Sequence, residues 1–204
     1  KTELLDFYLN YVKEIESINS RIDVTGGYSW QHFYQDGSSF VRNGDETQVS
    51  DNSKYITENY LVSFFGRLNY TFKDRYLVTF TLRDDGSSRF AKANRWGLFP
   101  AAAFAWKMKE EAFLKNVTAV SDLKLRLGCG ITGQQSVGND YPYLPVYRSS
   151  TSTAQYQFGN TFYNTLRPNP YDANIKWEET ATYNVGLDFG FLKNRIIGTI
   201  DAYK

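Results

Sequence analysis

Cysteine, histidine and methionine are nearly missing from this sequence, which has one of each in 204 residues. A single cysteine, Cys129, excludes an internal disulfide framework and a zinc site built on cysteines. A single histidine, His32, excludes every poly-histidine metal site and most catalytic triads. We therefore expect no metal and no cofactor, and the function classes that depend on such clusters are disfavoured.

Long apolar runs and an excess of one charge are missing as well. No run of about 18 apolar residues occurs, so we expect no helix to span a bilayer. The 23 basic and 22 acidic residues leave a formal net charge of +1, which does not point to nucleic acid as a partner. We expect no signal peptide within these residues, since both ends of the chain fall within alternating runs. The sequence therefore predicts that both ends are cut from a longer protein.

Aromatic residues in an alternating pattern are abundant instead. They make up 17% of the chain, and apolar and polar residues alternate in about eight runs of roughly ten residues each. In the run 60–72, Phe64 and Leu68 fall on one face, whereas Arg67 and Asn69 fall on the other. Rings gather near the run ends. This pattern predicts an all-β fold, an antiparallel up-and-down meander of about eight strands.

The connections between the runs alternate in length. Following the strands down and up places every long connection on one side of the sheet and every short one on the other. Outer-membrane barrels have this asymmetry, and strands of about ten residues, tilted by ~40–45°, cover their ~25 Å apolar band. The short turns are expected at 73–75 and 192–194, a linker with a short helix at 107–121, and long external loops at about 33–58, 84–95 and 135–177.

Two other architectures explain part of this pattern. A soluble carbohydrate-binding β-domain would pack its apolar faces against each other, but it accounts poorly for the one-sided loops and the rings at the strand ends. A small complete barrel of about eight strands would need an interior filled by side chains. The inner face of the run 96–107 is mostly glycine and alanine, which suits a wider barrel better.

Several short motifs follow one another in a fixed order. They are Gly66-Arg67-Leu68-Asn69-Tyr70 through Leu77, Arg83-Asp84-Asp85-Gly86-Ser87-Ser88-Arg89-Phe90, Asn94-Arg95-Trp96-Gly97-Leu98-Phe99-Pro100, Phe113-Leu114-Lys115-Asn116, Ser121-Asp122-Leu123-Lys124-Leu125-Arg126, Gly130-Ile131-Thr132-Gly133-Gln134-Gln135 through Asn139, Asn169-Pro170, Ile175-Lys176-Trp177-Glu178-Glu179-Thr180 and Asn184-Val185-Gly186-Leu187-Asp188-Phe189. In this order the motifs resemble the SusC/RagA family of TonB-dependent outer-membrane transporters. The resemblance is specific over about 59–204 and looser before it.

The resemblance implies that residues 1–204 form part of a 22-stranded transmembrane barrel, without its plug domain and remaining strands. Members of the family import oligosaccharides, or peptides in the RagA branch, across the outer membrane of Gram-negative bacteria. Their partners are a SusD-like lipoprotein lid and the TonB complex, which acts through the N-terminal region, and their surroundings are lipid. The parent protein is accordingly expected to serve glycan uptake, not catalysis. The resemblance also suggests that Arg67, Arg83, Lys124 and Arg126 form ion pairs with the plug.

No catalytic site is expected. The adjacent Asp84 and Asp85 would point to opposite faces of a strand, so they would not converge on one atom. His32 has no cluster of metal ligands around it and is interpreted as an interfacial polar residue. Cys129 lies on the apolar face, where a thiol behaves as a small hydrophobe. The glycines at 128, 130 and 133 are not followed by a helix, which disfavours a nucleotide loop.

The loop 135–177 is the best binding candidate, because aromatic rings stack on the C–H faces of sugars and phenols supply hydrogen bonds. An alternative is that these rings pack the loop against its neighbours or the lid, since long loops normally need an internal core. The residues proposed to bind substrate are Tyr141, Tyr143, Tyr147, Tyr156 and Arg148.

The two terminal strands, near 3–13 and 195–204, would expose unpaired edges in the isolated chain. Its apolar face would also lack lipid. We therefore expect the isolated chain to self-associate.

Overall fold

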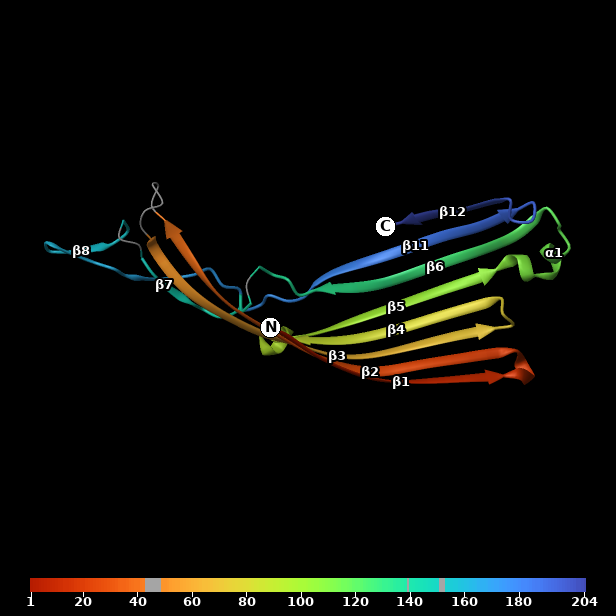
Figure 1. The fold of residues 1–204 in the computed structure, drawn as a ribbon, viewed down its shortest axis with the longest axis horizontal. Helices are drawn as coiled ribbons and strands as arrows, with labels where there is room; N and C mark the ends of the chain where they lie inside the picture. The colour runs from red at the N-terminus through yellow and green to blue at the C-terminus, as the bar shows by residue number, and fades with distance from the viewer. Residues whose placement is uncertain (43–48, 139, 151–152) are drawn as a thin grey trace.

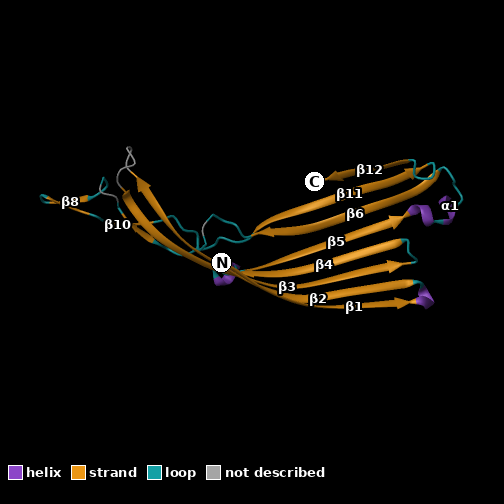
Figure 2. Ribbon diagram, in the orientation of Figure 1, coloured by secondary structure: helices purple, strands orange, loops and turns teal. Residues whose placement is uncertain are grey.

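A computed structural model describes residues 1–42, 49–138, 140–150 and 153–204 and shows one large antiparallel sheet (Figures 1 and 2). The eight strands of this sheet lie in chain order, and β11 lies next to β6 because β7 to β10 form two separate small sheets. They are β1 (Thr2–Ile15), β2 (Ser20–Arg42), β3 (Val49–Phe72), β4 (Tyr76–Ser87), β5 (Trp96–Lys107), β6 (Val120–Gln134), β11 (Glu178–Phe191) and β12 (Ile196–Tyr203). The all-β meander predicted from the sequence is confirmed.

The register places polar and apolar rows on opposite faces, as the alternation predicts. Leu68 pairs with Val24 and Phe80 across its two neighbouring strands, and one residue further along Asn69 starts a polar row. We call the two surfaces the apolar face and the polar face. The large side chains of the apolar face are not covered by protein, among them Phe7, Leu9, Tyr11, Phe64, Leu68, Phe80, Leu98, Leu127, Tyr183 and Val185. Cys129 shares this face, since it pairs with Ala102 and Tyr183.

Two rows of aromatic rings border the apolar face. At one border the Tyr76 ring lies 6.1 Å from that of Phe72 and 6.3 Å from that of Trp106. At the other border Trp30 and Tyr60 pair at 6.1 Å. The 13 residues from Tyr60 to Phe72 span ~40 Å along the strand and ~30 Å when tilted. We call the surface between these rows the apolar band.

The short connections gather at one end of the sheet, here called the turn end (on the right in Figure 1). Lys73 and Asp74 have φ of 50° and 55°, and Arg75 N–H donates to Phe72 O at 3.0 Å, so this turn closes in two residues. The turn predicted at 192–194 has positive φ at all three of its residues. The remaining elements at this end are η1 (Glu16–Ile18), η3 (Met108–Glu110) and α1 (Ala112–Lys115). No described helix has the length and apolarity needed to cross a membrane.

The opposite end, here called the loop end, is more ordered than the sequence predicts. The connection expected at 33–58 is not an irregular loop, because β2 and β3 stay paired from Phe33–Asn59 outwards to Arg42–Val49. The expected loop 84–95 is shorter, since β4 continues to Ser87 and η2 (Lys92–Asn94) follows. Within 135–177 lie two small hairpins: β7 (Tyr147–Ser149) with β10 (Leu166–Pro168), and β8 (Tyr156–Phe158) with β9 (Thr161–Tyr163).

The sheet is open, with β1 and β12 as its two edges. A closed barrel of eight strands is therefore not what these residues form. Their apolar face is not packed against a second sheet either, so the soluble β-domain considered above also fails. Figure 1 shows a single curved layer with the long connections at one end.

Candidate functional site: a polar pocket at the loop end

The polar face carries ion pairs that hold neighbouring strands together. Arg126 on β6 contacts Asp188 at 2.9 Å and Asp201 at 2.8 Å, and Lys124 reaches Asp188 at 3.1 Å. On β4, Arg83 Nε donates to Asp85 Oδ1 at 2.7 Å. Arg83, Lys124 and Arg126 thus pair with aspartates of the same sheet. Their pairing with a plug, which the resemblance suggests, stays a prediction.

A small aromatic core lies at the loop end and joins three of the motifs quoted above. Phe90, Phe99 and Trp177 are the buried large hydrophobic residues among those the structure describes. The Trp177 ring lies 5.2 Å from both other rings, and its Nε1–H donates to Arg95 O at 2.9 Å. Residues far apart in sequence therefore fix the turn after β4 to the start of β11.

Glycine leaves room for this core. A Cβ built at Gly133 would overlap the Phe99 ring, and one at Gly97 would crowd the rings of both Phe99 and Trp177. At both positions the groups that a larger side chain would meet are aromatic rings of the buried core.

The turn after β4 is tied to β3 and to the long loop. Tyr60 N–H donates to Ser88 Oγ, and Ser88 N–H donates to Tyr60 O, both at 2.9 Å. Arg89 then forms an ion pair with Asp140 at 2.8 Å, and Asn59 Nδ2 donates to the same carboxylate at 3.3 Å. Tyr141 O–H donates to the backbone oxygen of Glu58. The root of the loop 135–177 is thus held against the wall of the sheet.

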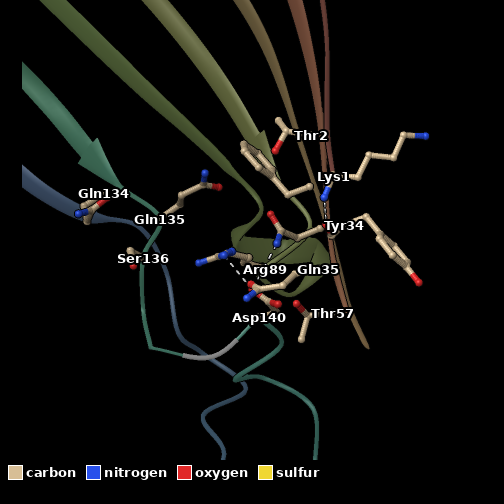
Figure 3. Close-up of a pocket in the computed structure, with 12 residues that line it drawn as sticks. Lys1, Thr2, Tyr34, Gln35, Thr57, Arg89, Gln134, Gln135, Ser136 and Asp140 are labelled. Atoms are coloured by element: carbon tan, nitrogen blue, oxygen red, sulfur yellow. Dashed lines mark hydrogen bonds and ion pairs between the residues drawn. The ribbon is translucent and has the colours of Figure 1, made fainter. Parts of the chain in front are cut away.

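These contacts enclose a cavity of about 490 Å³ on the polar face (Figure 3). Its size lies within the range of small-molecule sites. One side is formed by β2 and β3, and the other by the segment after β6. The lining is Lys1, Thr2, Phe33, Tyr34, Gln35, Thr57, Asn59, Arg89, Gln134, Gln135, Ser136 and Asp140.

Two polar atoms at this cavity are buried without a hydrogen-bond partner among the described residues, Nε of Arg89 and Oε1 of Gln135. One is a donor and the other an acceptor. Buried polar atoms are nearly always paired in folded proteins, so each exception asks for an explanation. A donor and an acceptor without partners therefore lie in the wall of the cavity, on two of the residues that line it.

The residues proposed from the sequence to bind substrate are not brought together. Tyr141 and Tyr143 lie near the pocket, with their rings 6.3 Å apart. Tyr147 and Arg148 belong to the exposed strand β7, and Tyr156 to the exposed strand β8. Arg89 and Gln135, which line the pocket, belong to two of the family motifs, and no pattern in the sequence predicts a binding role for them.

A second polar cluster lies at the loop-end border of the apolar face, outside the apolar band. His32 Nδ1 lies 3.0 Å from Glu3 Oε2, and its Nε2 lies 2.8 Å from Glu58 Oε1. Its ring stacks on Tyr60 at 4.5 Å. The hydrogen bond to Glu3, followed by that to Glu58, raises the pKa of His32. The ion pair with Lys1, followed by the bond to His32, lowers the pKa of Glu3 to about 2. His32 therefore ties β1, β2 and β3 together, and its place at a membrane interface stays a prediction.

Comparison with known proteins assigns the architecture. The family model described as TonB dependent receptor-like, beta-barrel matches residues 4–204. This chain belongs to the β-barrel family of TonB-dependent receptors. Within that family it is 51% identical over 204 residues to the TonB-dependent receptor SusC of Bacteroides thetaiotaomicron, covering 96% of this chain and 20% of the relative. It is 35% identical over 213 residues to the TonB-dependent receptor P3 of Formosa agariphila, covering 98% and 21%.

Solved structures agree on the fold of this receptor barrel. The structure of the RagAB peptide transporter superposes with a TM-score of 0.82 at 22% identity, covering 99% of this chain and 23% of that chain. The RagAB peptide importer in its open-open state gives a TM-score of 0.81 at 21% identity. The receptor chain spans about a fifth of the length of the curated relatives it matches. The polar face of its sheet corresponds to the inside of a barrel wall, and we call it the lumen face below.

Proposed function

We propose that residues 1–204 form part of the wall of an outer-membrane importer that takes up oligosaccharides. The identity of 51% to SusC across nearly the whole chain carries this proposal. In the proposed protein, the plug domain and the other strands lie outside these residues. The apolar band contacts lipid, the turn end faces the periplasm, and the loop end faces the cell exterior.

Two partners follow from the same proposal. A SusD-like lipoprotein covers the loop end, and the TonB complex supplies energy through a region outside this chain. Exposed rings on the loop 135–177 support a cover of this kind, because Tyr147, Tyr156, Phe158 and Phe162 are each more than half exposed. These rings either contact the lid or contact the substrate, and we retain Tyr141, Tyr143, Tyr147, Tyr156 and Arg148 as substrate candidates.

Growth of a deletion strain tests this function. A strain that lacks the receptor is complemented with the intact gene and grown on neutral oligosaccharides of three to eight sugar units, each as sole carbon source. We expect complementation to restore growth on at least one oligosaccharide but to leave growth on the corresponding monosaccharide unchanged. Normal growth of the deletion strain on every oligosaccharide would contradict the proposal.

Peptide import is the second candidate function, because the solved structures that superpose on the chain are those of a peptide transporter. The same deletion strain is supplied with a defined mixture of peptides as its nitrogen source. Loss of peptide uptake with unchanged oligosaccharide uptake would favour this candidate over the first.

Membrane placement has its own test. The unpaired edges of β1 and β12 and the uncovered apolar face lead us to propose that the 204 residues alone associate in water. Sedimentation in the absence of detergent should show oligomers or aggregate, and detergent should disperse them. A monodisperse, cooperatively melting monomer without detergent would contradict the lipid-facing assignment.

A further inference from the structure

The cavity on the lumen face has the features of a binding site with no assigned ligand. Its buried unpaired donor, Nε of Arg89, and its buried unpaired acceptor, Oε1 of Gln135, come from segments 46 positions apart in the chain. In Figure 3 the Gln135 side chain points from the segment after β6 towards the side on which Arg89 lies. An occupant that both accepts and donates a hydrogen bond would satisfy the two atoms at once.

The side-chain charges that line the cavity are already compensated. The Arg89 guanidinium is paired with the Asp140 carboxylate at 2.8 Å, whereas the Lys1 side chain points away from the cavity in Figure 3 and pairs with Glu3 at 2.5 Å. A carboxylate or phosphate on the ligand would have to displace one of these acids. The pocket is therefore suited to a neutral ligand, whereas the terminal charges of a short peptide would find no free counter-charge among these residues.

The other lining groups are those that bind hydroxyl groups. Gln35, Thr57, Asn59 and Ser136 add amides and hydroxyls, which both donate and accept hydrogen bonds. Phe33 contributes one aromatic ring to the lining, and such a ring packs on the C–H face of a sugar. A volume of about 490 Å³ leaves space for a small ligand.

We infer that this cavity is a subsite for a neutral sugar unit, in which Gln135 Oε1 accepts from one hydroxyl and Arg89 Nε donates to another. The inference rests on the proposed import of oligosaccharides, and it adds the position on the barrel wall at which one sugar unit binds. In this arrangement Asp140 and Asn59 are positioning residues, because they hold the guanidinium of Arg89 and the root of the long loop.

Binding to the intact receptor, purified in detergent with its lipoprotein partner, tests the subsite. The probes are fluorescently labelled neutral oligosaccharides of three to eight units, and the readout is the dissociation constant. We expect Gln135→Leu, which keeps the approximate size but removes the acceptor, to weaken binding by about tenfold or more. Gln157→Leu is the matched control, since Gln157 lies on the exposed strand β8, and its dissociation constant should stay unchanged.

Deoxygenated probes separate a direct contact from a general loss of structure. Removing the hydroxyl that donates to Gln135 should weaken binding to the wild type by about tenfold, yet should change binding to Gln135→Leu by less than about twofold. Thr57→Val on the opposite side of the cavity provides a second variant should Gln135→Leu fold poorly, and it should also weaken binding.

The outcomes distinguish the subsite from the proposed function. Wild-type receptor that binds and imports an oligosaccharide while Gln135→Leu and Thr57→Val bind it equally well would overturn the subsite and leave the function standing. Wild-type receptor that binds no oligosaccharide but binds the peptide mixture would overturn both. A full response of the Gln135→Leu variant to the deoxygenated probe would also overturn the subsite.

Discussion

The two ends of the sheet hold their connections in opposite ways. At the turn end the hydrogen bond from Arg75 N–H to Phe72 O joins residues three apart, and no large hydrophobic side chain described there is buried. At the loop end Trp177 donates to the backbone of Arg95, 82 positions away, and three aromatic rings form a buried core. One end is determined by local backbone conformation and the other by contacts between distant segments.

This difference predicts at which end of the sheet substitutions should affect the stability of the receptor most. A two-residue turn depends on which residues tolerate positive φ, so its effects on stability are small and confined to the turn. A core that joins separate segments loses all its contacts together when one ring is removed. Substitutions at the loop end should therefore have larger and longer-range effects than substitutions at the turn end.

Removal of a core ring should give the largest effect. Trp177→Ala deletes a buried indole, and we expect the intact receptor to lose about 3–5 kcal/mol of unfolding free energy. Hydrogen exchange measured by mass spectrometry should accelerate in residues 87–100. Phe113→Ala in α1, where the ring is exposed, should change stability by no more than about 0.5 kcal/mol. Equal effects of the two substitutions would contradict the contrast between the ends.

Filling a glycine site next to the core should give the next largest effect. Gly133→Ala places a Cβ into the Phe99 ring, and the overpacking should cost about 1–3 kcal/mol. Gly26→Ala is the matched control, because the nearest atom to its added Cβ is 4.0 Å away. Chemical denaturation in detergent measures the change in unfolding free energy for both variants. A neutral Gly133→Ala would show that the ring shifts freely.

A substitution in the turn at the other end should raise stability slightly. Asp74 has a φ of 55°, a conformation that costs an ordinary residue energy but suits glycine. Asp74→Gly should therefore stabilise the receptor by about 0.5–1 kcal/mol, measured as a shift in the denaturation midpoint. Thr71→Gly in the adjoining strand should instead be destabilising. Loss of stability at both positions would show that backbone conformation does not determine this turn.

The smallest expected effect is a difference in pH response between the ends. The pKa of His32 is raised, first by the bond to Glu3 and also by that to Glu58. Its contribution to folding stability is therefore fully present below the unfolded pKa of about 6.5 and is lost as pH rises through the folded pKa. At the turn end the bond from Tyr76 O–H, with that from Trp106, lowers the pKa of Glu111. That contribution is present above the unfolded value and is lost as pH falls through the folded pKa. Alkaline pH should therefore weaken the loop end alone.

Nuclear magnetic resonance of the His32 ring in the intact receptor measures this response. Glu3→Gln should lower the pKa of His32 towards its ordinary value, because it removes the largest cause of the shift. Glu14→Gln, on the same strand at the turn end, should leave the titration unchanged. An unaltered titration in Glu3→Gln would show that the hydrogen bond from His32 to Glu3 does not control the pKa of the histidine.

The sequence predicted the strands, their faces and the turn end, because each depends on neighbouring residues. Period two sets which face Arg67 and Leu68 occupy, and a short polar run such as 73–75 forms a turn by itself. The extension of β2 and β3 into the segment 33–58 was missed. The apolar residues of that segment fall at odd and even positions alike, as Phe40 with Val41 and Tyr55 with Ile56 show, so alternation gives no signal there although the backbone stays paired.

The pocket could not be predicted, because no local pattern links its parts. Arg89 and Asp140 are 51 positions apart, and only the fold shows that they form an ion pair. The loop tyrosines were chosen because exposed rings are typical of sugar sites, and the structure distributes them over the pocket border and two separate hairpins. Alternation places a residue on a face but does not give the path of a returning loop.

The paired extension of β2 and β3 beyond the apolar band has a consequence for evolution. Its backbone hydrogen bonds are made between the two strands and do not depend on side-chain identity, so its residues should tolerate replacement at little cost in folding. With the loop end at the cell exterior, as we propose, bacteriophages and antibodies would reach this projection, and a bacterium could alter its antigens there while the barrel wall stays the same.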